Sequence, residues 1–308
     1  MNMQTTIAKA VTLSGIGLHS GSTVTLRLLP AAANTGVVFR RLDVEPLHAM
    51  IAARWDAVCD TRLGTTIKNA QGVSVSTIEH LMAALWGAGL DNVLVELDAP
   101  EVPIMDGSSA PFVDLLKKAG VAKLAKSKSI LRALKTVEVR EGESIASISP
   151  NQEGDEGMVI SITVEYSNAV IGRQQAVYDF RESSFNDELS RARTFGFEYE
   201  VEAMQNAGLA LGGSLENAIV VGEHKVLNAE GLRFDDEFVR HKALDCVGDL
   251  FLAGARIDGA LTFTRPGHGI NNKLLRALLA DPSAYELVSS EGASFAPVRA
   301  TQYNLLSL

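Results

Sequence analysis

The sequence predicts a mixed α+β protein made of two similar halves, and three observations lead to this fold class. Residues 1–70 contain short segments of alternating apolar and polar residues, such as 23–28 (TVTLRL), which is typical of half-buried strands. A helix, a strand, a glycine-containing loop and a second helix are predicted over 76–119, and the same order recurs over 235–280. The polar, basic segment 120–128 (GVAKLAKSK) separates the halves and marks the expected domain boundary.

In the first half, the apolar stripe of residues 76–86 predicts a helix, and Ser76 or Thr77 suits its N-cap. Residues 92–97 (NVLVEL) then predict a strand. After a loop, residues 111–119 predict another helix, which starts with a proline, a residue favoured at the first helical position.

In the second half, residues 235–252 have the strongest helical pattern of the chain. A strand, the glycine-flanked loop 265–269 (RPGHG) and a helix over 271–280 are predicted to follow. When the two halves are overlaid, His80 falls on Asp245. The recurrence suggests a duplicated unit whose two copies face each other, and chance similarity of two α/β units is the alternative.

The composition excludes several classes of protein. The chain has 308 residues, 46% hydrophobic and 21% charged, as in a globular protein, and its net charge of -9 argues against a nucleic-acid partner. It lacks the run of about 20 apolar residues that spans a bilayer and the apolar core of a secretory signal. Two cysteines, Cys59 and Cys246, are too few for a disulfide framework. We therefore expect a cytoplasmic protein in which both are small buried residues.

The long helix of the second half carries the first candidate metal ligands. His241 and Asp245 are four residues apart, so they share one face of the helix, and that face also carries apolar residues. Burying both without a partner is costly, and coordination of a metal ion offsets that cost. The alternative is an ion pair on a solvated face.

Glu79 and His80 begin the other central helix. Adjacent helical residues diverge by about 100°, so one can bind a metal ion while the other takes a proton from water. His80, His241 and Asp245 together supply two nitrogens and one oxygen. This set suits one catalytic zinc ion with an open position, and it also accepts ferrous iron. For His80 alone, a hydrogen-bonded core histidine is the alternative.

His268 lies in the glycine-flanked loop, where the backbone can approach a ligand closely. A histidine that is charged near neutral pH can protonate a leaving amine. Asp249, one turn beyond Asp245, could orient or charge that imidazole. An ordinary turn histidine is the alternative.

Taken together, several segments resemble the UDP-3-O-acyl-N-acetylglucosamine deacetylase family. They cover nearly the whole chain in the family's order, and the HKxxD string of the long helix is especially specific. The matching segments are 14–21 (SGIGLHSG), 76–85 (STIEHLMAAL), 102–114 (VPIMDGSSAPFVD), 190–197 (SRARTFGF), 211–221 (LGGSLENAIVV), 227–251 (LNAEGLRFDDEFVRHKALDCVGDLF) and 267–275 (GHGINNKLL).

The resemblance implies two similar domains, each a β-sheet layered with α-helices. The helices would be sandwiched between the sheets, with the active site at the interdomain cleft. Domain I would span residues 1–126, with a small insert near 34–67. Domain II would span residues 127–308, with an insert near 197–221 that binds the acyl chain in an apolar passage. Ordinary core packing accounts equally well for the apolar residues of the second insert.

The resemblance also implies roles for individual residues. Zinc would be bound by His80, His241 and Asp245. Glu79 would be the general base and His268 the general acid, with Asp249 beside it. Thr194 would stabilise the tetrahedral oxyanion. Substrate contacts would come from Lys242, His19, Phe195 and Arg265. The acyl passage would be lined by residues such as Leu18, Val201, Ala210 and Leu215.

Three positions depart from the pattern of many family members. Ser149 and Arg265 stand where lysines are common, and Gly64 stands where a cysteine near the zinc is common. Arg265 keeps the positive charge but changes its geometry.

The resemblance therefore implies a zinc-dependent amidohydrolase of the lipid A pathway in Gram-negative bacteria. It would release acetate from UDP-3-O-(3-hydroxyacyl)-N-acetylglucosamine, leave a free amine, and work as a monomer on this small-molecule substrate. The near alternative is hydrolysis of a different N-acylated sugar nucleotide. A non-catalytic binding protein of the same fold is the alternative from another class.

Overall fold

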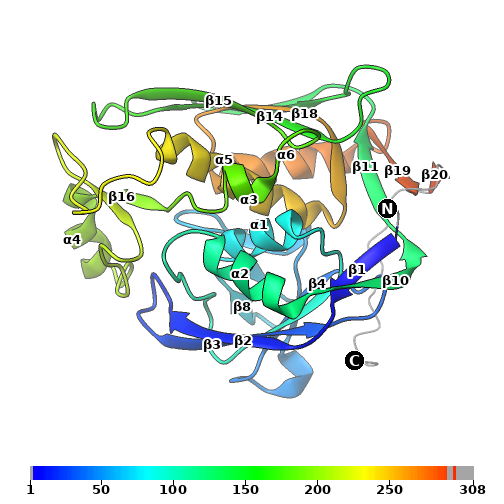
Figure 1. Cartoon of the computed structure of the whole chain (residues 1–308), viewed down its shortest axis with the longest axis horizontal. Coiled ribbons are helices and arrows are strands. Elements are labelled where there is room, and N and C mark those ends of the chain that lie inside the picture. The colour runs from blue at the N-terminus through cyan, green and yellow to red at the C-terminus, as the bar shows by residue number, and fades with distance from the viewer. Residues whose placement is uncertain (1–2, 290–293, 296–308) are drawn as a thin grey trace.

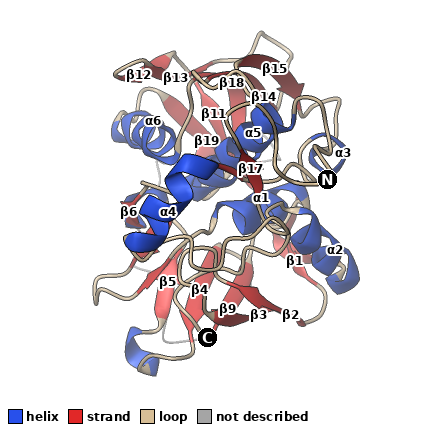
Figure 2. Cartoon of the chain, turned by 90° about the vertical axis from the view of Figure 1, so that its left-hand side faces the viewer, coloured by secondary structure: helices blue, strands red, loops and turns tan. Residues whose placement is uncertain are grey.

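The computed structural model describes residues 3–289 and 294–295, and it has a layered architecture (Figure 1). One large sheet lies on each side of the molecule, and helices α1, α2, α5 and α6 lie between the sheets. Figure 2 shows the same layers from the side. The predicted α+β class, with helices sandwiched between sheets, is confirmed.

The first large sheet has the strand order β2-β3-β9-β4-β5. Its strands are β2 (Val11–Ile16), β3 (Thr23–Pro30), β4 (Val37–Arg41), β5 (Met50–Ala52) and β9 (Val93–Leu97). All its pairs are antiparallel except β4 with β9. Every residue of β9 is buried, as expected for a central strand with an apolar sequence. Its one charged residue, Glu96, pairs with Arg27 and Arg40.

The second large sheet has the order β12-β13-β18-β11-β19-β20, and β14 pairs with both β15 and β18. Its strands are β11 (Ser129–Ala133), β12 (Val137–Glu141), β13 (Ser144–Ser149), β14 (Met158–Glu165), β15 (Arg173–Asp179), β18 (Arg256–Thr264), β19 (Tyr285–Ser289) and β20 (Ser294–Phe295). Burial alternates along β14, so only one face of this strand packs on the core.

Three smaller sheets complete the strands. They are formed by β6 (Val58–Asp60), β7 (Thr66–Lys68) and β8 (Ser74–Val75); by β1 (Met3–Ile7) and β10 (Val121–Ser127); and by β16 (Phe195–Phe197) and β17 (Ile219–Val221). The polar segment between the halves thus forms β10, which pairs with the first described strand. The domain limits and the two inserts stay predictions.

The helices are α1 (Glu79–Gly87), α2 (Ala110–Ala119), α3 (Phe185–Glu188), α4 (Glu198–Asn206), α5 (Glu237–Leu250) and α6 (His268–Ala280), with short 3-10 turns at Pro46–His48, Trp55–Ala57 and Phe251–Ala253. Two predicted helix starts are wrong. The N-cap of α1 is Ile78, because the Thr77 hydroxyl donates to Glu101 instead of capping the helix. His268 is the first residue of α6 rather than part of a loop before it.

The centre of the molecule is the contact between α1 and α5. All residues of α1 from Glu79 to Trp86 are buried, as expected for a helix enclosed on all sides. At Gly248 of α5, an added Cβ would lie 2.1 Å from the Glu79 carbonyl oxygen. Only glycine lets the two backbones approach this closely.

Two further sequence expectations concern burial and membrane spans. Cys246 is buried in α5 as expected, but Cys59 is exposed because β6 belongs to a small sheet at the surface, so that prediction was wrong. In the described part of the chain, each helix is too short or too polar to cross a bilayer.

Gly248→Ala should destabilise the fold by about 2 kcal/mol or more, because the new methyl group overlaps the backbone of α1. Urea unfolding measures this loss. Gly196→Ala is the matched control, since its Cβ would meet open space, and it should change stability by less than about 0.5 kcal/mol. Equal stability of the two variants would contradict the tight α1–α5 contact.

Candidate metal and catalytic site

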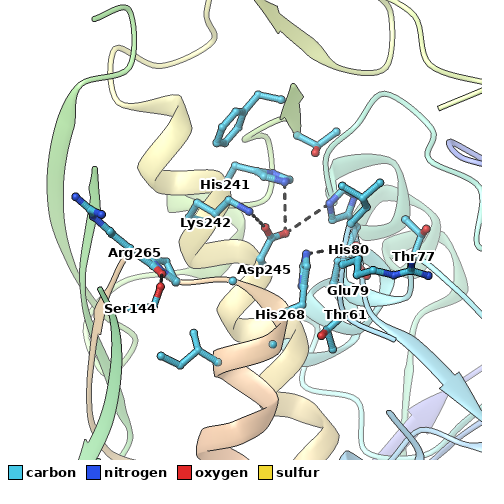
Figure 3. Close-up of a pocket in the computed structure, with 18 of the residues that line it drawn as sticks. Thr61, Thr77, Glu79, His80, Ser144, His241, Lys242, Asp245, Arg265 and His268 are labelled. Carbon is cyan, nitrogen blue, oxygen red and sulfur yellow. Dashed lines mark hydrogen bonds and ion pairs between the residues drawn. The ribbon is translucent and has the colours of Figure 1, made fainter. Parts of the chain in front are cut away.

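A cavity of about 380 Å³ is lined by residues of α1, α5 and α6 and by loops from both halves of the chain (Figure 3). Five residues with predicted metal-binding or acid–base roles line this cavity: Glu79, His80, His241, Asp245 and His268. Residues distant in sequence therefore meet at one place in the fold.

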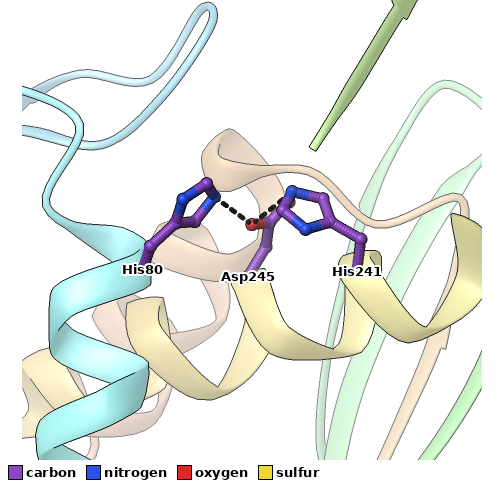
Figure 4. Close-up of side chains that lie close together, drawn as sticks. All are labelled: His80, His241 and Asp245. Carbon is purple, nitrogen blue, oxygen red and sulfur yellow. Dashed lines mark ion pairs between the residues drawn. The ribbon is translucent and has the colours of Figure 1, made fainter. Parts of the chain in front are cut away.

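His80, His241 and Asp245 form a compact buried cluster at the cavity wall. Each offers one potential ligand atom, and these atoms lie within 4.8 Å of one another. Asp245 Oδ1 lies 3.7 Å from His80 Nε2 and 3.3 Å from His241 Nε2 (Figure 4). Since His80 belongs to α1 and the other two belong to α5, the packing of these helices creates the cluster.

Burial sets the charge states of this cluster. It lowers the pKa of both imidazoles, to about 3 for His80, so both rings are neutral near pH 7, the state in which imidazole binds metals. Burial alone would raise the pKa of Asp245, but the ammonium of Lys242, 2.9 Å from Oδ2, helps to hold it well below its usual range. The carboxylate is therefore charged.

Glu79 and His268 face each other beside this cluster, with Glu79 Oε1 4.0 Å from His268 Nε2. Burial, together with the charges of Asp249 and Asp245, raises the pKa of Glu79 to about 7, against the opposing effect of His268. Burial lowers the pKa of His268, but Asp249 and Glu79 raise it more, to about 9. Glu79 can thus accept a proton near neutral pH while His268 still carries one.

Asp249 lies behind His268 and is not among the residues that line the cavity. Its Oδ2 is 2.8 Å from His268 Nδ1 and accepts a hydrogen bond from Asn271 at 2.9 Å. Its Oδ1 accepts a hydrogen bond from the Thr65 hydroxyl at 2.5 Å. These contacts fix the imidazole so that Nε2 points toward Glu79.

Sequence reasoning missed Thr65 and Asn271. The backbone N–H of Thr65 donates to Glu79 Oε2 at 2.9 Å, so this one residue contacts both Glu79 and the carboxylate behind His268. At the neighbouring Gly64, an added Cβ would lie 2.9 Å from Glu79 Oε1. A threonine in a loop gives no signal in a single sequence, because its role depends on partners far along the chain.

Five residues with predicted oxyanion or substrate roles also line the cavity: Leu18, Thr194, Phe195, Lys242 and Arg265. The Thr194 backbone is held on both sides, since its N–H donates to Gly107 O at 2.8 Å and its carbonyl accepts from Ile219 N at 2.8 Å. Lys242 Nζ lies 5.7 Å from the centre of the Phe195 ring. This places an ammonium and an aromatic face side by side at the cavity wall.

Arg265 lines the cavity, but its guanidinium pairs with Glu143 and with Glu165, at 3.2 Å in the second case. Its charge is therefore already compensated. Ser149, the other departure from the family pattern, is not among the lining residues, and its hydroxyl lies 2.9 Å from the Thr136 hydroxyl.

Of the residues expected in an acyl passage, Leu18 lines the cavity. Ala210 donates its N–H to His19 Nδ1 at 3.4 Å, so these two lie together beside Leu18 without lining the cavity themselves. Val201 lies on α4, which has no buried residue, and Leu215 is 47% exposed. The passage stays a prediction.

Comparison with known proteins identifies the family. Residues 4–280 match the sequence model of the UDP-3-O-acyl N-acetylglycosamine deacetylase family. The chain belongs to this family. A UDP-3-O-acyl-N-acetylglucosamine deacetylase of Pseudoalteromonas atlantica is 48% identical over 301 residues, which are 97% of each chain. A protein of the same name from Shewanella oneidensis is 46% identical over 98% of this chain and 97% of the relative. Another, from Pasteurella multocida, is also 46% identical, over 96% of each chain.

The resemblance to the deacetylase family implies zinc, and the three buried side chains fit that ion. His241 Nδ1 lies 3.1 Å from the Ala192 carbonyl, so its proton is on Nδ1 and Nε2 presents a lone pair. That lone pair faces Asp245 Oδ1, which is buried and has no hydrogen-bond partner among the described residues. Two acceptors that face each other without a proton are stabilised by a cation. Nitrogen and carboxylate oxygen are also donors that zinc accepts.

His241→Ala should reduce bound zinc from about one ion per chain to well below that, because it removes one of three donors. Metal analysis after dialysis measures this. His224→Ala is the matched control, since the His224 side chain is 84% exposed, and it should keep its zinc. Equal zinc content in the two variants would exclude His241 as a ligand.

Proposed function

We propose that this protein hydrolyses the acetamide of UDP-3-O-(3-hydroxyacyl)-N-acetylglucosamine to acetate and the free amine, in the cytoplasm, as the committed step of lipid A biosynthesis. Its membership of the deacetylase family supports the substrate. The observation that carries the chemistry is the cavity itself. There, a cluster of three potential metal ligands adjoins a carboxylate whose pKa is about 7 and an imidazole whose pKa is about 9. The cavity would lie between the two predicted domains.

In this proposal, His80, His241 and Asp245 hold one zinc ion. When bound, zinc supplies Lewis-acid chemistry, polarising a carbonyl and making water easier to deprotonate. The same donor set accepts ferrous iron, so metal replacement distinguishes the two ions. Lys242 keeps Asp245 charged and oriented through its contact with Oδ2, which leaves Oδ1 for the metal.

Glu79 is the proposed general base. With its pKa near 7, its carboxylate can take a proton from the attacking water at neutral pH. His268, whose pKa lies near 9, remains protonated and donates its Nε2 proton to the leaving nitrogen of the glucosamine. The loss of this amine needs such a donor, since an amide anion is a poor leaving group. Asp249 keeps the imidazole charged and aligned.

Other residues of the cavity would bind the substrate. Thr194, held by backbone hydrogen bonds on both sides, is proposed to stabilise the oxyanion. Lys242 and Phe195 offer a charged group and an aromatic face to the polar part of the substrate. His19 and Leu18 would contact the substrate from the adjoining loop, toward the proposed acyl passage.

The proposal predicts acetate release from UDP-3-O-(3-hydroxyacyl)-N-acetylglucosamine by the purified protein. A chelator should abolish this release, and about one equivalent of zinc should restore it. In the same assay, Glu79→Gln should keep its zinc and lose about 10²-fold or more in kcat, because the amide cannot accept the proton. Absence of activity in the zinc-loaded protein would point to another N-acylated sugar nucleotide, tested next.

Asp249→Asn should move the alkaline limb of the kcat/KM profile to lower pH. A general acid works only while it is protonated, so the rate falls as pH rises through the His268 pKa of about 9. Burial lowers that pKa and Asp249 raises it, so removing the carboxylate shifts the loss of rate toward pH 7. An unchanged alkaline limb would show that His268 is not the acid.

A further inference from the structure

Glu101 is a buried carboxylate that neither the metal cluster nor the acid–base pair uses. It is 1% exposed and follows β9 by four residues. Its Oε1 accepts hydrogen bonds from the backbone N–H of His19 at 2.9 Å and from the Thr77 hydroxyl at 3.0 Å. Its Oε2 accepts one from the backbone N–H of Ser20 at 2.9 Å. Within the described residues, these three neutral donors are the only hydrogen-bond partners of the Glu101 side chain.

The three donors come from two segments that both reach the cavity. Thr77 lines it and precedes Glu79 by two residues. Its φ of +57° lies in the left-handed region, which is strained for a β-branched residue. Ser76, next to it, is bridged to the backbone around Glu101 on both sides, through Pro100 O and Val102 N. The start of α1 therefore depends on the segment that carries Glu101.

The other segment is the loop 17–21, in which Leu18 lines the cavity. At Gly17, an added Cβ would lie 2.2 Å from Ser20 Oγ and 2.5 Å from Glu101 Oε2, so both the serine hydroxyl and the carboxylate lie directly against the loop backbone. From the opposite side, Leu211 N–H donates to His19 O at 3.2 Å and Gly212 N–H donates to Leu18 O at 3.0 Å. The loop is thus held between Glu101 and the segment 210–212.

The contact between the loop and the segment 210–212 also fixes the tautomer of His19. Its Nδ1 accepts the hydrogen bond from Ala210, so its proton is on Nε2. That Nε2 is buried and has no hydrogen-bond partner among the described residues. An oriented, unpaired donor beside the cavity is suited to an acceptor oxygen of the ligand.

We propose that Glu101 is a positioning residue that locks the loop 17–21 to the start of α1, and so sets Leu18 and His19, the proposed substrate contacts, in register with Glu79 and His80. The inference rests on the proposed function for the identity of the substrate. A carboxylate is required because three donors converge on its two oxygens. Glutamine has one acceptor oxygen, and its NH₂ group would face a donor.

Glu101→Gln tests the proposal, with Glu96→Gln as the matched control. Glu96 is likewise buried and lies within β9. It pairs with Arg27 and Arg40 and is not among the residues lining the cavity. Glu101→Gln should raise KM about tenfold or more, with a smaller change in kcat and unchanged zinc content. Hydrogen exchange should also show lost protection of the amides of His19 and Ser20. Glu96→Gln should leave KM and these amides unchanged.

Gly17→Ala in a Ser20→Ala background provides a second variant, compared with Ser20→Ala alone. At Gly17 an added Cβ would lie 2.2 Å from Ser20 Oγ and 2.5 Å from Glu101 Oε2, so once the serine hydroxyl is removed the methyl group displaces the carboxylate without removing it. The double variant should reproduce the rise in KM and the faster amide exchange, and it decides the matter if Glu101→Gln does not fold. Unchanged KM with full amide protection would overturn the proposal, and so would equal effects of Glu101→Gln and Glu96→Gln. If the wild-type protein has no deacetylase activity, the proposed function fails, while amide exchange still decides whether Glu101 holds the loop.

Discussion

The packing of α1 against α5 is the contact on which the rest of the site depends. Spacing along α5 brings only two potential ligands together, and the third has to come from another segment. The glycine at position 248 lets the helices approach so closely that the rings of His80 and His241 lie 4.9 Å apart, centre to centre. Since both helices are enclosed between the two large sheets, this geometry is held by the whole apolar core.

The same enclosure buries several ionisable groups away from solvent. Glu79, Asp245 and Asp249 are each 3% exposed, a burial that is unfavourable unless partners compensate for lost hydration. Asp249 has three hydrogen-bond donors, whereas one oxygen of Asp245 has none among the described residues. Both pKa values of the acid–base pair are raised: that of Glu79 to about 7 by burial and by the nearby charges of Asp249 and Asp245, and that of His268 to about 9 by Asp249 and Glu79, against the effect of burial.

Two residues with strained backbone conformations line the same cavity. Five non-glycine residues in the described part of the chain have positive φ, and Thr77 and Arg265 line the cavity directly. Each of these two is held by its surroundings: Thr77 by the Glu101 carboxylate, and Arg265 by a backbone hydrogen bond to Thr163 O at 2.8 Å. Such strain persists only where neighbouring contacts enforce it, and it keeps the walls of the cavity in one conformation.

The sequence by itself determined the α+β class, the helix that carries His241 and Asp245, and the family. These follow from periodicity and from strings of adjacent residues, which are local properties of the chain. The structure brings His80 beside that helix, as the expected ligand set requires. Only the tertiary structure decided that His268 begins α6, and that Thr65 and Glu101 hold the groups around the cavity. The same holds for the shifted pKa of Glu79, which arises from burial. Contacts between distant segments and the exclusion of water depend on how the layers pack, and no local pattern encodes them.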